Sequence, residues 1–97
     1  METIINQIFE ISQKSESQTE INLSRNLKRI YSELEEMGYQ IIDPIGRPYK
    51  ETDSDIEANI SGGISKKSKV EKVLKPIIYK NENGSNVLIQ KGIVIVG

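Results

Sequence analysis

Cysteine, histidine and tryptophan are all absent from the 97 residues of this chain. Without cysteine there can be no disulfide framework and no thiol chemistry. Without histidine the usual general base is missing, and any metal site would have to be built from carboxylates alone. These absences predict a protein that is not an enzyme, and no pattern in the sequence calls for a cofactor.

Excess charge and long apolar runs are also missing. The 13 basic residues nearly balance the 14 acidic residues, so no bulk attraction to nucleic acid is expected. The N-terminus has no basic segment followed by an apolar run, and no apolar stretch is long enough to span a bilayer. We therefore expect a cytoplasmic protein without a membrane partner. A chain of this length buries a modest core, so association with a second copy would support the fold.

The first 38 residues predict a helical hairpin. Apolar residues recur every three or four positions within Glu2–Lys14, which is typical of an amphipathic helix. Ser17 and Glu20 have the spacing of a capping box, which favours a second helix over about Thr19–Met37. One continuous helix through this region is the alternative.

The predicted second helix carries the clearest pattern in the sequence, a heptad seam of apolar residues: Leu23, Leu27, Ile30, Leu34 and Met37. One hairpin cannot cover both flanks of such a stripe, whereas two hairpins can form a four-helix bundle. We therefore expect a homodimer interface at Leu23, Leu27, Ile30 and Leu34. Packing of the stripe on the chain's own first helix or sheet is the alternative.

The character of the chain changes at Gly38. A glycine after the last apolar residue of the seam can close a helix in the left-handed conformation. Tyr39–Ile42 then suits a short strand, and Asp43–Gly46 reads as a turn. The sequence thus predicts a helical dimerisation arm over residues 1–38, joined with almost no linker to a small β-domain over residues 39–97.

Residues 39–97 predict four to six short strands, mostly antiparallel. Ile56–Ile60 alternates apolar and polar residues as a half-buried strand does. Val70–Lys80 contains Pro76, so it is an edge strand, a bulged strand or two strands. Asn83-Gly84 is a strong hairpin signal, and Gly92 marks a bulge or bend between the last two apolar runs. The fold class is α+β: an N-terminal helical hairpin of the dimeric four-helix-bundle type, then the β-domain.

Two charged stretches invite chemical hypotheses. Asp53, Asp55 and Glu57 have the spacing of a calcium loop, but alanine and isoleucine stand where that loop needs glycine and glutamate. We therefore expect a solvated acidic turn and no metal. The lysines of Lys66–Lys75 have no aromatic residue among them for base stacking, so a solvated loop and strand edge is favoured over a nucleic-acid site.

The order of these features resembles the GrpE family, the nucleotide exchange factors of DnaK-type chaperone ATPases. Leu27–Gly38 resembles the family's second bundle helix, which typically ends in glycine, and Tyr39–Tyr49 resembles its strand followed by proline, glycine and an aromatic residue. Asn83-Gly84 resembles its hairpin, and Gly92–Val96 resembles its closing strand. Two arginines usual in the family are replaced, at Ser85 and Gln90.

The resemblance implies a function. A GrpE-like co-chaperone would bind the nucleotide-binding domain of a DnaK-type chaperone through its β-domain and promote ADP release. The positions that the resemblance carries over as partner contacts are Asn83, Gly84, Gln90 and Val96. The alternative is a dimeric adaptor with a GrpE-like fold that has lost exchange activity and recognises another protein through a sheet edge.

Overall fold

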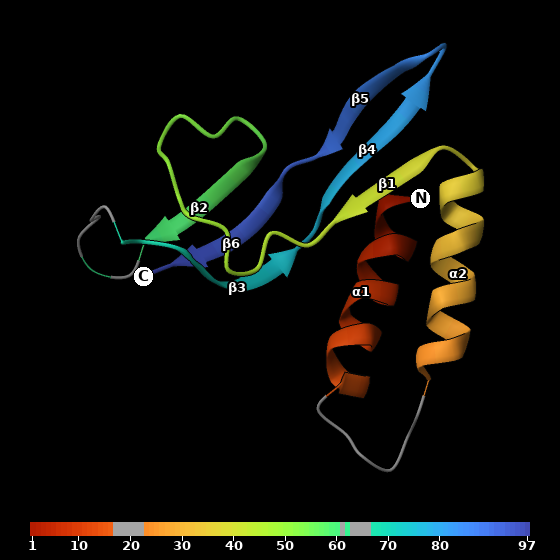
Figure 1. Ribbon diagram of the computed structural model, residues 1–97, viewed down its shortest axis with the longest axis horizontal. Coiled ribbons are helices and arrows are strands. Elements are labelled where there is room, and N and C mark those ends of the chain that lie inside the picture. Colours follow the sequence, from red (N-terminus) through yellow and green to blue (C-terminus); the bar gives the residue numbers. More distant parts are fainter. Residues whose placement is uncertain (17–22, 61, 63–66) are drawn as a thin grey trace.

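The computed structural model describes residues 1–16, 23–60, 62 and 67–97, and the structural statements below refer to these residues. Two helices precede six strands (Figure 1). In chain order the elements are α1 (Glu2–Glu16), α2 (Ser24–Glu36), β1 (Tyr39–Ile42), β2 (Ile56–Ile60), β3 (Val70–Lys75), β4 (Ile77–Glu82), β5 (Ser85–Gln90) and β6 (Gly92–Val96). The α+β class predicted from the sequence is confirmed.

The two helices lie side by side and run in opposite directions (Figure 1). The helical hairpin is therefore confirmed against a single continuous helix. Helix α2 begins at Ser24 and not near Thr19 as the sequence predicted. The predicted capping box at Ser17 and Glu20 lies outside the described residues.

The joint between helix and sheet is built as the sequence predicts. Gly38 has a φ of 92°, the left-handed conformation that closes helix α2. Its N–H bonds to the carbonyl of Glu35 at 2.9 Å, and its own carbonyl accepts the N–H of Asn81 at 2.8 Å. The residue that ends the helix therefore also aligns the start of β1 with the end of β4.

The strands form two three-stranded sheets, β1-β4-β5 and β2-β6-β3. Every pair is antiparallel except β2 and β6, which run parallel from Ile56↔Gly92 to Ile60↔Val96. The prediction of mostly antiparallel strands is confirmed, but the parallel pair was not foreseen. A parallel pair needs a long connection, and here β3, β4 and β5 all lie between β2 and β6 in the chain.

Two adjacent single-residue joints carry the chain between the sheets. Pro76 separates β3 from β4, so Val70–Lys80 is two strands, one of the three alternatives left open by the sequence. Lys91 separates β5 from β6 in the same region. A Cβ on Gly92 would lie 2.9 Å from Cγ1 of Ile77, so the two crossings pack too closely for any larger residue there. Gly92 therefore serves close packing and begins β6.

Helix α1 contributes to both hydrophobic cores. Phe9 packs with the buried side chains of the β2-β6-β3 sheet and with Ile77. Ile5 packs with Leu34 of α2 and Ile78 of β4. The change of secondary structure at Gly38 is sharp, but the apolar packing crosses it, so the hairpin is fixed directly against the sheets.

The long connection between β1 and β2 runs alongside β3. Its first turn closes from Pro44 to Arg47, one residue later than predicted, because Gly46 supplies the positive φ of 77° at the third position. Backbone bonds then join Gly46 and Arg47 to Val70, at 2.9 Å each. The connection is thereby ordered without being a strand of either sheet.

Candidate functional site

The β4–β5 hairpin projects away from the rest of the molecule, and its tip is formed by Asn83 and Gly84 (Figure 1). Their φ values of 54° and 83° are those of a type I′ turn, which matches the twist of the strands it joins. The side chain of Asn81 accepts the N–H of Gly84 at 3.2 Å and steadies the turn. The hairpin predicted from the sequence is confirmed, and both tip residues are exposed.

Strand β5 forms the outer edge of the first sheet, since it pairs only with β4. It contains no charged residue and no proline, the two features that usually protect an edge strand. Val87 and Leu88 are exposed on it. The edge and the tip together offer backbone hydrogen-bonding groups and apolar side chains to a partner.

Gln90, carried over from the resemblance as a partner contact, is occupied within the chain. Its Oε1 accepts Nδ2 of Asn6 at 3.0 Å, and its Nε2 donates to Oδ1 of Asn6 at 2.9 Å. The same Nε2 donates to the carbonyl of Pro76 at 2.9 Å. These bonds use both amide hydrogens and the oxygen, so the side chain joins α1 to the two crossings between the sheets.

Val96, the fourth of those positions, lies in the core with no exposed side chain. It belongs to the cluster formed by the second sheet and Phe9. In this structure its side chain therefore packs internally and does not face a partner. Of the four positions, Asn83 and Gly84 are exposed, Gln90 is half-buried and Val96 is buried.

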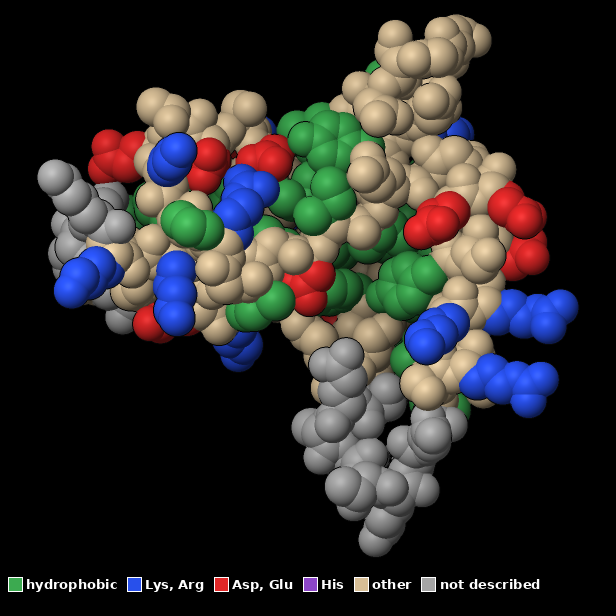
Figure 2. All heavy atoms as spheres, viewed as in Figure 1, with side chains coloured by type: hydrophobic (Ala, Val, Ile, Leu, Met, Phe, Trp, Pro, Cys, Tyr) green, Lys and Arg blue, Asp and Glu red, His purple; other side chains and the backbone are tan. Residues whose placement is uncertain are grey.

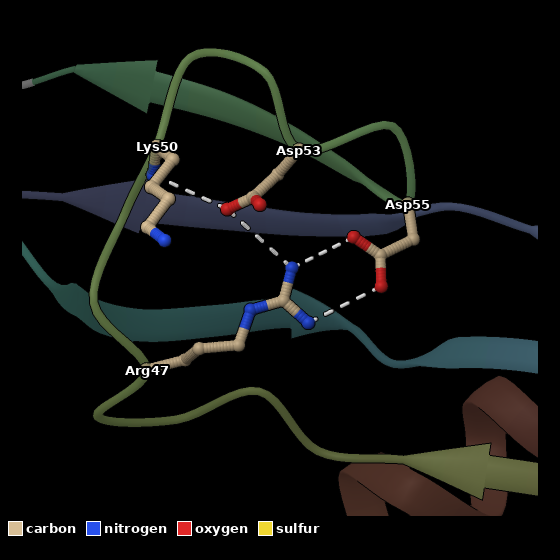
Figure 3. Close-up of polar contacts among 4 residues, drawn as sticks. All are labelled: Arg47, Lys50, Asp53 and Asp55. Atoms are coloured by element: carbon tan, nitrogen blue, oxygen red, sulfur yellow. Dashed lines mark hydrogen bonds and ion pairs between the residues drawn. The ribbon is translucent and has the colours of Figure 1, made fainter.

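A charged cluster anchors the connection between β1 and β2 (Figure 3). The guanidinium of Arg47 binds both carboxylate oxygens of Asp55, at 2.7 and 3.2 Å, and lies 3.6 Å from Asp53. Asp53 in turn accepts the backbone N–H of Lys50 at 3.2 Å. The expectation of a solvated acidic turn is wrong here, because Arg47 holds both half-buried carboxylates.

This arrangement shifts the titration of the pair. The hydrogen bonds and charge of Arg47 lower the pKa of Asp55 below its ordinary value, and Asp55 raises the pKa of Arg47. Within the described part of the chain, no group of three or more acidic side chains is arranged to hold a metal ion. The ion pairs of Arg47 join the two ends of the segment from Arg47 to Asp55.

The heptad seam divides between two environments. Leu34 is 5% exposed and packs on Ile5 and Ile78 of the same chain, whereas Ile30 is 39% exposed. Leu23 and Leu27 are half-buried. Intramolecular packing, the alternative left open by the sequence, therefore accounts for Leu34. Intramolecular packing leaves two apolar stripes exposed: Ile4 and Ile11 on α1, and Ile30 on α2 with Met37 at its C-cap.

The basic stretch forms no single-sign surface where it is described. Lys67, Lys69, Lys72 and Lys75 are all exposed along and before β3, and Lys66 lies outside the described residues. In Figure 2 the basic side chains over the second sheet alternate with acidic ones. Lysines on an outer strand protect its edge against unwanted pairing, which is the role expected of them at β3.

Neither the Asn6–Gln90 pair nor the Arg47–Asp55 pair can be predicted from the sequence pattern. The first joins residues 84 positions apart, and an amide is too common a side chain to reveal such a partner. The second spans eight positions within a connection that has no periodic pattern.

No described helix has the length and apolar character that crossing a membrane would need.

Comparison with known proteins returns no relative. No protein-family model matches the chain, and no curated protein or solved structure is significantly similar to it.

Proposed function

We propose that this protein is a GrpE-like co-chaperone that promotes ADP release from a DnaK-type chaperone ATPase through its β-sheets. What supports the proposal is the order of the motifs that carry the resemblance: helix-ending glycine, strand, proline–glycine turn, Asn-Gly hairpin and closing strand. The two strands are β1 and β6, and the glycine, the turn and the hairpin contain the positive-φ residues at which the chain changes direction. Of the residues carried over, Asn83 and Gly84 are the surface positions, and β5 beside them is an open edge.

The proposed activity requires no chemistry from this chain. A protein that binds the open form of an ATPase more tightly than its closed form shifts the population toward the open form. Each tenfold difference in affinity between the two forms corresponds to about 1.4 kcal/mol. The hairpin tip and the β5 edge would supply that differential contact.

The proposal includes a homodimer formed by the helical hairpins. The stripe of Ile4 and Ile11 and the stripe of Ile30 and Met37 are each spaced by one heptad, and all four side chains are exposed. A second hairpin packed on them would complete a four-helix bundle. Leu34 would then stabilise the single chain, and Ile30 with Met37 would face the second copy.

A dimeric adaptor without exchange activity is the second candidate, and one observation favours it. Gln90 is engaged by Asn6 and Pro76, and Val96 is buried, so two of the four carried-over contacts are not displayed. A protein that kept the fold while replacing its charged contacts would recognise a different partner through the same open edge.

The two candidates are separated by measuring release of a fluorescent nucleotide from the organism's own DnaK-type ATPase, with and without this protein. An exchange factor accelerates release, and Asn83→Gly, which keeps a residue suited to positive φ but removes the amide, weakens the effect. Lys75→Ala, on the second sheet, is the matched control. Binding without acceleration, or no binding at all, contradicts the exchange proposal and leaves the adaptor.

A further inference from the structure

A cavity of about 210 Å3 lies between the helical hairpin and the end of β1. Six residues line it: Phe9, Ser12, Gln13, Tyr31, Ile41 and Asp43. In Figure 2 hydrophobic side chains gather in the middle of the molecule, next to an acidic side chain, where helices and sheets meet. The cavity is smaller than the roughly 300–1,000 Å3 typical of sites for drug-sized ligands. Its size therefore suits one side chain of a partner.

The hydroxyl group of Tyr31 can accept a further hydrogen bond but has no hydrogen left to donate. Ser12 donates its single hydroxyl hydrogen to the carbonyl of Ile8 at 2.9 Å. In the 3.2 Å contact between Ser12 and Tyr31, the phenol is consequently the donor. The oxygen of Tyr31 then keeps its lone pairs for an incoming donor.

Two further polar side chains add acceptors. The amide nitrogen of Gln13 donates one of its two hydrogens to the carbonyl of Val73 at 3.1 Å, which leaves one N–H and the acceptor Oε1. Oδ1 of Asp43 accepts the N–H of Ile45 at 3.1 Å, and among the described residues no cation pairs with this carboxylate. None of the six lining residues is basic.

We propose that this cavity receives an arginine side chain of a partner protein. A guanidinium carries five N–H donors and no acceptor, which complements the acceptors offered by Tyr31, Oε1 of Gln13 and the carboxylate of Asp43. Its aliphatic stem suits the apolar wall of Phe9 and Ile41. Its planar face suits the ring of Tyr31, and its charge suits Asp43. This site is separate from the hairpin tip, and the inference holds whether or not the proposed exchange activity does.

The test is titration of the full chain with capped peptides, followed by NMR. The probe is acetyl-Gly-Arg-Gly-amide, and its matched control carries citrulline, which is isosteric but uncharged. Saturable shifts of the Tyr31 ring and of the Ile41 and Asp43 amides are expected with the arginine peptide, and binding about tenfold weaker with citrulline. Equal binding of the two peptides, or shifts confined to other residues, would overturn the inference.

Variants locate the interaction. Asp43→Asn keeps an oxygen for the N–H of Ile45 but removes the charge. Binding of the arginine peptide should therefore become about tenfold weaker, while the shifts of the Tyr31 ring remain at saturation. Glu57→Gln, on β2 outside the cavity, should bind like the parent. Unchanged affinity in Asp43→Asn contradicts the site. Because the arginine and citrulline peptides are compared on the parent protein, the test stands even if a variant unfolds.

The source of the guanidinium is tested by a free compound. Agmatine has the same guanidinium and stem but no peptide backbone. If a partner protein supplies the group, the peptide binds at least as tightly as agmatine, since the backbone stays outside the cavity. Binding of agmatine with exclusion of the peptide would instead assign the cavity to a small metabolite and overturn the partner proposal.

Discussion

Asn6 and Gln90 face each other as a reciprocal amide pair, each donating to the other at 2.9–3.0 Å. Gln90 also donates to the carbonyl of Pro76, one of the two joints between the sheets. One side chain therefore connects the first helix, the end of β5 and the crossing from β3 to β4.

The first prediction concerns this pair. Asn6→Ala and Gln90→Ala should each destabilise the protein by about 1–2 kcal/mol, since the first leaves the Gln90 oxygen without its donor and the second leaves the Asn6 amide without its partner. The double variant should lose less stability than the sum of the losses in the two single variants, with a coupling energy of about 1 kcal/mol. Urea unfolding of the four proteins measures this cycle, and strictly additive costs would show that the amides do not interact in solution.

The second prediction concerns pH. Arg47 lowers the pKa of Asp55 in the folded protein. The contribution of this ion pair to stability is therefore present above the unfolded-state pKa of about 3.9, and it disappears as the pH falls through the lower folded-state pKa. Arg47→Met should therefore cost about 1 kcal/mol at neutral pH and progressively less in acid. Urea midpoints across the pH range from neutral to strongly acidic measure it. A cost independent of pH would assign the role of Arg47 to packing alone.

The third prediction concerns the close approach at Gly92. Gly92→Ala would place a methyl group 2.9 Å from the fully buried Ile77, so a loss of about 1–3 kcal/mol is expected. Ile77→Ala removes the obstructing Cγ1 but leaves a cavity, so the cost of the double variant should be smaller than the sum of the two single costs. Thermal unfolding compares the single and double variants, and a fully stable Gly92→Ala protein would show that the crossings can separate.

The fourth prediction concerns Gly38. A Cβ there has ordinary contacts, the nearest 3.5 Å away, so the cost of substitution comes from the backbone conformation alone. Gly38→Ala should lose about 1–2 kcal/mol, and Gly38→Asn less, because asparagine tolerates positive φ. Equal melting temperatures for the parent and the alanine variant would argue against the left-handed conformation.

The fifth prediction separates the two halves of the heptad seam. Ile30→Asp places a charge on the exposed stripe, so it should turn a dimer into a folded monomer. Leu34→Asp buries a charge within the single chain, so it should unfold the protein at a cost of several kcal/mol. Analytical ultracentrifugation with circular dichroism distinguishes these outcomes. A parent that is monomeric at high micromolar concentration removes the dimer from the proposed function.

Local signals predicted most of the elements. Gly38, Pro76 and Asn83-Gly84 act through backbone conformations that a few neighbouring residues determine, so their effects are readable in a short stretch of sequence. The predicted strand Ile56–Ile60 is present with its predicted bounds. Helix α2 begins later than the spacing of Ser17 and Glu20 predicts, because a capping-box pattern of two common residues does not by itself determine where a helix begins.

The arrangement of these elements could not be predicted in the same way. Leu34 and Ile30 belong to one seam, and packing against Ile5 and Ile78 buries the first while the second stays exposed. Asn83 is a surface residue at a hairpin tip and Val96 is a core residue of the second sheet, although the resemblance implies that both contact a partner. Pairing of distant side chains, such as Asn6 with Gln90, depends on the completed fold.

The place of β6 in its sheet has a consequence for synthesis. Both β2 and β3 pair within their sheet only with β6, which follows them in the chain. As a ribosome releases the chain from its N-terminus, the helical hairpin and the first sheet can assemble early, since they need residues only as far as β5. The second sheet has no strand pairing until Gly92–Val96 emerges. During that interval Ile56 and Val70, buried in the finished molecule, are the side chains most open to capture by other proteins.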